Sequence, residues 1–215
     1  DLAFIAANVP KILHGGWFPL VTAIVIFTLL ATWKRGRDIL MLRLNTEAME
    51  VVPFVAAITA HPPLRVSGTA VFLTASRGGV PHSMLHNLAH NKVLHERVIF
   101  LTIVTEEIPY VPPIDRFQVE SLGNGFFSIL LHFGFKDDPD VPQALARCKP
   151  LGPDLNMLET SFFFSRETLI ATRLPGMARW REKLFIGMAR NASSAMGFFK
   201  IPPNRVIELG AQVEL

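Results

Sequence analysis

The 215-residue chain is poor in cysteine and in charge, and both shortages narrow what it can be. Its one cysteine, Cys148, excludes a disulfide within the chain and a zinc site built from cysteines. Charged residues make up 18% and apolar residues 50% of the chain, which fits neither a disordered protein nor an ordinary soluble domain. Where the apolar excess lies therefore decides the class of protein.

A 19-residue stretch without a charged side chain runs from Gly15 to Trp33. As a helix it would be about 28 Å long, close to the thickness of the hydrocarbon core of a bilayer. Trp17 and Trp33 stand near its two ends, where membrane helices place interfacial aromatic residues. Core helices of this length rarely lack charge, so the pattern predicts a transmembrane helix over residues 15–33.

The charges beside this span predict its orientation. Four basic residues follow it closely: Lys34, Arg35, Arg37 and Arg43. Because Lys11 is the only basic residue before the span, the positive-inside rule places the chain after Trp33 in the cytoplasm. The first 43 residues hold 5 of the 21 basic and 2 of the 18 acidic side chains, which leaves 16 of each beyond them. The net charge of +3 thus belongs to the membrane border, and nucleic acid is not an expected partner.

The changes in apolar and charged composition along the chain divide it into four predicted segments. The chain opens at Asp1 inside an apolar stretch without an initiator Met, so we expect a fragment of a longer protein. Residues 1–10 are expected to end a preceding membrane helix, since so few residues cannot span a bilayer alone. Residues 34–50 are expected to form a basic juxtamembrane linker, and residues 51–215 one cytosolic domain.

The cytosolic part is predicted to be α/β, with a mixed, mainly parallel sheet flanked by helices and preceded by the one transmembrane helix. Runs 68–74 and 96–104 have the β-branched and aromatic composition of strands buried on both faces, and a helix at 81–91 would make them parallel neighbours. Gly123-Asn124-Gly125 predicts a hairpin turn. Four further elements are expected: a helix at 140–148, a strand at 161–164, an amphipathic helix at 177–191 and a strand at 205–215.

The expected helix at 177–191 carries both apolar and basic residues. Its apolar side is predicted to hold four residues: Met177, Trp180, Leu184 and Met188. Its basic residues are Arg179, Arg181, Lys183 and Arg190. Because Glu182 interrupts them and the domain as a whole is neutral, we interpret them as a solvated helix surface.

Four histidines crowd one region of the chain: His82, His86, His90 and His95. The first three are spaced four apart, a spacing that lets two imidazoles of a helix reach one metal ion. A metal site needs a third ligand, and Glu96 is the only acid nearby. We therefore favour a polar surface facing solvent or a partner, and predict no metal site.

The segment between the first expected strand and helix is a weak candidate for an anionic ligand. It contains Thr74, Ser76, Arg77, Gly78 and Gly79, at a place where open α/β sheets often cradle a phosphate. No glycine-rich phosphate-binding motif is present, so a plain connecting loop is the favoured interpretation and no cofactor is expected. We also expect no enzymatic activity, because no serine has the flanking glycines of a nucleophile elbow.

Several long blocks stand out together: HGGWFPL (14–20), VSGTAVFLT (66–74), LHNLAHNKVLHER (85–97), MARWREKLFIGMARNA (177–192) and PPNRVIELGAQVEL (202–215). In collinear order over the whole chain, they closely resemble the bacterial Kup branch of the KUP/HAK/KT potassium uptake transporters. The resemblance implies the carboxy-terminal end of such a transporter: the end of the penultimate membrane helix, the last membrane helix and the cytosolic domain.

The resemblance also implies a function for the full-length protein. It would import K⁺ together with H⁺ across the inner membrane of the cell, as a homodimer arranged through the cytosolic domains. The family's ion sites lie in earlier helices, so no transport residue is assigned to this chain. Some relatives bind the regulatory nucleotide cyclic di-AMP, which the resemblance does not map onto residues here. The alternative is a single-span membrane protein with an independent cytosolic α/β nucleotide-binding module, which would lack further membrane spans upstream.

Overall fold

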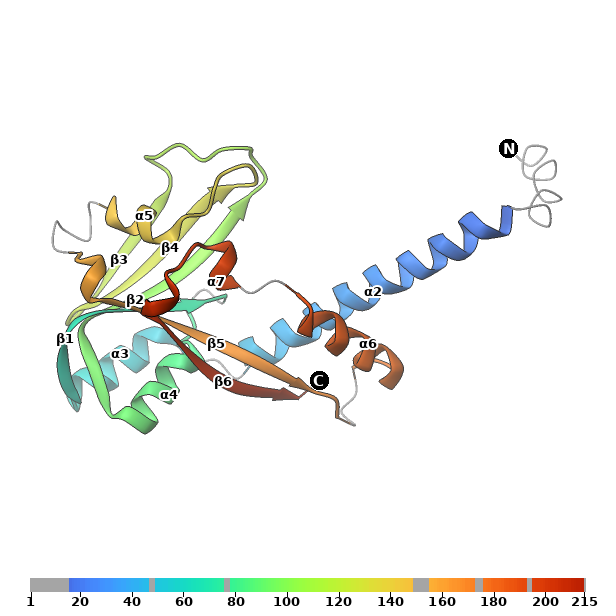
Figure 1. The fold of residues 1–215 in the computed structure, drawn as a ribbon. Helices are drawn as coiled ribbons and strands as arrows, with labels where there is room; N and C mark the ends of the chain where they lie inside the picture. The colour runs from blue at the N-terminus through green and yellow to red at the C-terminus, as the bar shows by residue number, and fades with distance from the viewer. Residues whose placement is uncertain are drawn as a thin grey trace. The chain divides into compact units, whose positions relative to one another are not determined.

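The computed structural model describes residues 16–46, 49–75, 78–148, 155–172, 176–192 and 195–214. They form two compact units: one contains the first helix as far as Leu42 together with residues 169–192, and the other contains residues 43–168 and 193–213. The helices and strands in chain order are α2 (Trp17–Thr46), α3 (Val51–Ala60), β1 (Leu64–Thr74), α4 (His82–Asn91), β2 (Val93–Glu106), β3 (Phe117–Gly123), β4 (Phe126–Gly134), α5 (Val141–Ala146), β5 (Thr160–Ile170), α6 (Arg179–Arg190), α7 (Ala195–Phe198) and β6 (Val206–Glu214) (Figure 1).

Helix α2 is long and apolar enough to cross a membrane, as judged by length and composition. Only 6% of the most apolar stretch of this helix is buried. Side chains such as Phe27 are largely exposed, as expected for a surface that would face lipid. The helix does not end with the apolar stretch but continues to Thr46. Residues 34–46, expected to be a linker, are therefore helical, and the expected boundary at residue 34 marks a change in charge within one helix.

The second unit is built on a six-stranded sheet of order β3-β4-β2-β1-β5-β6. Strand β1 pairs in parallel with β2 and β5, and β2 pairs in parallel with β4. The unit β1, α4, β2 is thus the predicted strand, helix and parallel strand. Strands β3 and β4 are antiparallel and joined at the predicted turn, where Asn124 has a positive φ of 50°. The mixed, mainly parallel α/β fold is confirmed.

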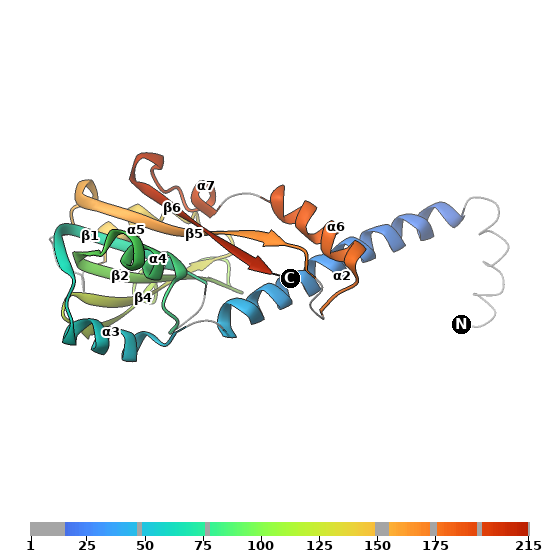
Figure 2. The ribbon, with the colours of Figure 1, turned by 90° about the horizontal axis from the view of Figure 1, so that it is seen from below.

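Helices cover both faces of this sheet because consecutive strand residues point to opposite sides. On one face, Ile99 and Phe162 belong to a core that α5 completes. On the other, Phe100 and Phe163 belong to a core with α3 and α4. Figure 1 shows α5 on one side of the sheet and α3 and α4 on the other, and Figure 2 views the molecule from the side of α4. Central strands buried on both faces explain the continuous apolar runs in the sequence.

Among the described residues of this unit, α3 is the one long element that the sequence analysis did not anticipate. Its sequence, VVPFVAAITA, has a proline and three valines, which disfavour a helix by propensity. Pro53 lies in the first turn, where its missing N–H costs little, and Val51, Phe54 and Val55 are buried against the sheet. Tertiary burial therefore decides the conformation of this segment.

Candidate functional site

The described backbone of the predicted ligand loop holds the start of α3. Thr74 ends β1, while Ser76 and Arg77 lie outside the described residues. The Val51 N–H donates to the Gly78 carbonyl at 3.0 Å, and Glu50 and Gly79 form an antiparallel bridge. These backbone groups bind protein, so the described part of the loop has a structural role, and its use for an anionic ligand stays a prediction.

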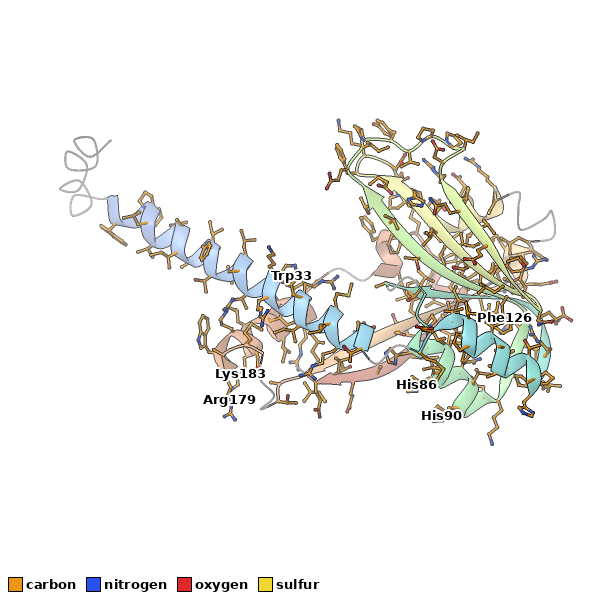
Figure 3. All side chains as sticks on the ribbon, turned by 180° about the vertical axis from the view of Figure 1, so that it is seen from behind. Trp33, His86, His90, Phe126, Arg179 and Lys183 are labelled. Carbon is orange, nitrogen blue, oxygen red and sulfur yellow. The ribbon has the colours of Figure 1, made fainter. Side chains whose placement is uncertain are left out.

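The four histidines lie on two elements. His82, His86 and His90 are on α4, where the rings of His86 and His90 are nearly parallel with centroids 6.0 Å apart (Figure 3). His95 is on β2, with its ring edge-on to Phe163 at 5.9 Å, and burial lowers the pKa of its imidazole. Across the described part of the chain, no three potential ligands among His, Cys, Asp and Glu gather in a way that could hold a metal ion.

Asp137 fastens the segment between β2 and β3 to the end of β4. Its carboxylate accepts hydrogen bonds from the N–H groups of Val111 at 3.0 Å and Gly134 at 2.7 Å, and from Nη2 of Arg116 at 3.1 Å. Burial alone would raise the pKa of Asp137, but the two backbone hydrogen bonds and the Arg116 guanidinium together lower it below its ordinary value. The ionised carboxylate is therefore the form that stabilises the fold.

Replacing Asp137 with asparagine is expected to destabilise the protein by about 2 kcal/mol at pH 7, because charge-assisted hydrogen bonds are lost. A pKa lowered by folding means that the contribution is complete above about pH 4, the unfolded value, and is lost as the pH falls through the folded pKa. Thermal unfolding of the intact protein in detergent, followed between pH 3 and 7, measures this. Asp115→Asn, at an exposed position of the same segment, is the control and should change little; equal effects of the two variants would contradict this role for Asp137.

Helix α6 contacts α2 near the start of its charged end. Nε of Arg181 donates to Oγ1 of Thr32 at 3.0 Å, and Thr32 is fully buried. The rings of Trp33 and Phe185 are 5.5 Å apart between centroids. Phe185 also lies against Gly36, where an added Cβ would be 2.4 Å from the ring. Helix α6 therefore packs where the charge-free stretch of α2 ends.

The segment before α6 extends this contact by about one turn of α2. An added Cβ at Gly176 would be 3.2 Å from Cδ1 of Ile39, which is 8% exposed. Nη2 of Arg35 reaches the Gly176 carbonyl at 3.4 Å, a long hydrogen bond. Contacts to Thr32, Gly36 and Ile39 follow a helical spacing of three to four, so one side of α2 receives both α6 and Gly176.

The predicted apolar side of α6 is wrong. Trp180 is 59% exposed, whereas Phe185 and Ile186 are buried. Apolar residues stand on two different sides of this helix. The space that Gly36 leaves for the Phe185 ring favours burial of the side that carries Phe185. Glu182 turns inward with this side and is 2% exposed, so it does not interrupt the basic residues as expected.

These contacts between α6 and α2, called the joint below, hold two helices together and are not arranged for a chemical reaction. A hydrogen bond, a ring pair and a close helix approach fix α6 to α2, while Arg179, Lys183 and Arg190 are exposed. In Figure 3, Arg179 and Lys183 lie on the side of α6 away from Trp33. The signal in the sequence that could have located the joint is Gly36, a lone glycine inside a long helix, which often marks a close approach.

Two family models match this chain. The model described as the K+ potassium transporter C-terminal domain matches residues 67–215. The model described as the K+ potassium transporter integral membrane domain matches residues 1–38. The first covers the sheet unit from within β1 onward together with α6, and the second includes the charge-free stretch of α2. No solved structure matches.

Curated relatives match over the whole chain. A protein named "Probable potassium transport system protein Kup" from Thiobacillus denitrificans is 56% identical over 216 residues, covering 100% of this chain and 34% of that protein. One of the same name from Pseudomonas fluorescens is 55% identical, with the same coverage. "Probable potassium transport system protein Kup 2" from Chromobacterium violaceum is 53% identical, covering 35% of that protein. The chain spans about a third of the length of these relatives.

Proposed function

We propose a function from one premise, that this chain belongs to the K+ potassium transporter family. It is the carboxy-terminal part of a protein that takes up K⁺ together with H⁺. The observation that carries the proposal is the meeting of two family models in one chain: the integral membrane domain over residues 1–38 and the C-terminal domain over residues 67–215. The transported ions bind elsewhere in the longer protein, and no residue of this chain is assigned to their path.

Helix α2 spans the inner membrane of the cell, and everything after Trp33 is cytoplasmic. The charge-free stretch supports the span, and the cluster of basic residues from Lys34 to Arg43 supports the orientation. Phe27 and its apolar neighbours, exposed in the structure, would then contact lipid or other membrane helices of the transporter. The sheet unit lies in the cytoplasm and acts as a regulatory and dimerisation domain, not as an enzyme.

The contact between α6 and α2 is the route by which the carboxy-terminal domain, of which α6 is a part, influences transport. A domain tied to a membrane helix changes activity when it favours one of the conformations that the helix adopts. Helix α2 continues without a break through residues 34–46, and α6 packs on it around Gly36. A displacement of α6 would therefore be passed to the membrane span through this contact.

A regulatory nucleotide such as cyclic di-AMP stays a candidate ligand of the cytosolic domain. Its place would be the segment from Thr74 to Gly79, at the carboxyl end of β1, where parallel sheets commonly bind ligands. The contrasting class, a single-span protein with an independent nucleotide-binding module, draws no support from the two family models, since both are described as parts of a potassium transporter.

Growth of a bacterium that lacks its own potassium uptake systems tests the proposal. The intact protein that contains this chain is expected to restore growth at limiting K⁺, and a protonophore should abolish the uptake. Removal of residues 50–215 should leave the protein in the membrane but weaken uptake, about tenfold for a typical regulatory coupling. Failure of the intact protein to restore growth would contradict potassium uptake; full activity of the truncated protein would contradict the regulatory role alone.

A further inference from the structure

The outward side of α6 carries positive charge and an aromatic ring with no acidic residue among them. Arg179, Trp180, Lys183, Gly187 and Arg190 are all exposed. The three cations are spaced so that they fall within one stripe of the helix, with the indole beside them. Glu182, the one acid of α6, is buried. None of the three cations forms an ion pair within the described residues.

The contacts of α6 fix its depth along α2. Arg181 bonds Thr32 and Phe185 packs on Trp33 and Gly36, at the point where the charge-free stretch gives way to basic residues. At this level α2 adds exposed cations of its own, Lys34, Arg35 and Arg37, against one exposed acid, Asp38. If α2 spans a membrane, as the proposed function requires, α6 lies at the level of the lipid head groups.

We propose that the outward side of α6 binds the phosphate head groups of anionic phospholipids in the cytoplasmic leaflet. Arg179, Lys183 and Arg190 supply cations for the phosphates, and Trp180 enters the interface between head groups and acyl chains. Basic side chains beside an anionic leaflet favour binding by about fivefold each, and about a hundredfold for three. Because α6 is fixed to α2, bound lipid also stabilises the contact between these two helices.

The chemistry of this surface favours lipid over a protein partner. The centre of a protein interface is depleted of charged residues, whereas this side of α6 has three separate cations beside a single indole. A long basic side chain beside an interfacial tryptophan is the composition of helices that lie on membranes. The same end of α2 shows the same pair of features, with Trp33 followed by Lys34 and Arg35.

A nitroxide label at Gly187 tests the proposal in the intact protein, since an added Cβ there has no atom within 4 Å. The protein is placed in nanodiscs of two kinds, phosphatidylcholine alone and phosphatidylcholine with about a third of the anionic lipid phosphatidylglycerol. With phosphatidylglycerol, the accessibility of the label to a water-soluble paramagnetic reagent should fall severalfold. The triple variant Arg179→Gln, Lys183→Gln, Arg190→Gln should lose this response.

A second triple variant separates local from overall charge. Lys92→Gln, Lys136→Gln and Arg147→Gln remove the same charge from exposed positions of the sheet unit and should leave the response intact. A Gly187 label that ignores lipid charge, or that is immobilised alike in both nanodiscs by protein, would overturn the proposal. A label at Phe27 reports independently whether α2 lies in hydrocarbon, so failure of the membrane placement is distinguished from failure of lipid binding.

Discussion

Replacing Gly36 with leucine is expected to lower potassium uptake by the intact protein about tenfold, at unchanged amounts in the membrane. The ring of Phe185 already lies 2.4 Å from where a Cβ at position 36 would be, and Phe185 is fully buried against Trp33. A side chain there must displace the Phe185 ring and so disturbs the packing of α6 on α2. Uptake of rubidium as a potassium substitute into cells, with membrane content measured on the same samples, gives the result.

Gly187→Ala is the matched control for this experiment. It also places a Cβ on a helical glycine, but at an exposed position of α6 with nothing within 4 Å, so uptake should be unchanged. Gly36→Ala should give an intermediate loss, and adding Phe185→Leu, which shortens the opposing side chain, should recover part of it. Wild-type uptake by Gly36→Leu would contradict the role of the joint in transport.

Replacing Gly125 with alanine is expected to destabilise the sheet unit by about 3 kcal/mol. Its φ of +82° costs a residue with a side chain about 1–2 kcal/mol, and its Cβ would be 2.3 Å from the Glu96 carbonyl oxygen, which adds about 1–3 kcal/mol of packing strain. Gly123 provides the control, because it has a φ of +81° but nothing within 4 Å of an added Cβ. Gly123→Ala should therefore show the backbone cost alone.

The surroundings of Gly125 explain why little relaxation is expected. Arg65 donates from Nη1 to the carbonyls of His95 and Glu96 and from Nη2 to that of Asn124, and its guanidinium lies 5.1 Å from the centre of the Phe126 ring. This network fixes the hairpin turn against β2. Thermal unfolding in detergent should separate the two alanine variants by about 4–8 °C. Equal midpoints would contradict the steric argument.

The parts of this fold that follow local rules could be predicted from the sequence. The apolar runs of β1 and β2, the helix between them and the glycine-flanked turn at Asn124 each carry their own signal, and the structure confirms all of them. Which side of α6 is buried could not be predicted. Trp180 and Phe185 lie on different sides of the helix, and each side has apolar residues at a helical spacing. Contacts with residues distant in sequence, among them Gly36, favour the Phe185 side.

The same limit applies to the candidate site. The sequence indicated a ligand loop after β1 and a histidine stripe, because those motifs are local; the joint between α2 and α6 brings together residues about 150 positions apart. Its basic surface was interpreted as ordinary solvated charge because Glu182 stands among the cations in sequence. The structure turns this acid inward, so that the exposed cations are left together.

Cross-linking α6 to α2 within the membrane-inserted protein tests the central claim most directly. A Cβ at Gly176 would lie 3.9 Å from Cγ1 and 4.0 Å from Cγ2 of Ile39, the positions that the sulfur of a cysteine at residue 39 takes, so a small shift brings two cysteine sulfurs together. In an intact protein otherwise free of cysteine, the pair Ile39→Cys and Gly176→Cys should lose maleimide labelling rapidly on mild oxidation, while the pair Ile39→Cys and Gly187→Cys should keep it. Equal labelling of the two pairs after oxidation would contradict the joint, and with it the coupling and lipid proposals that rest on it.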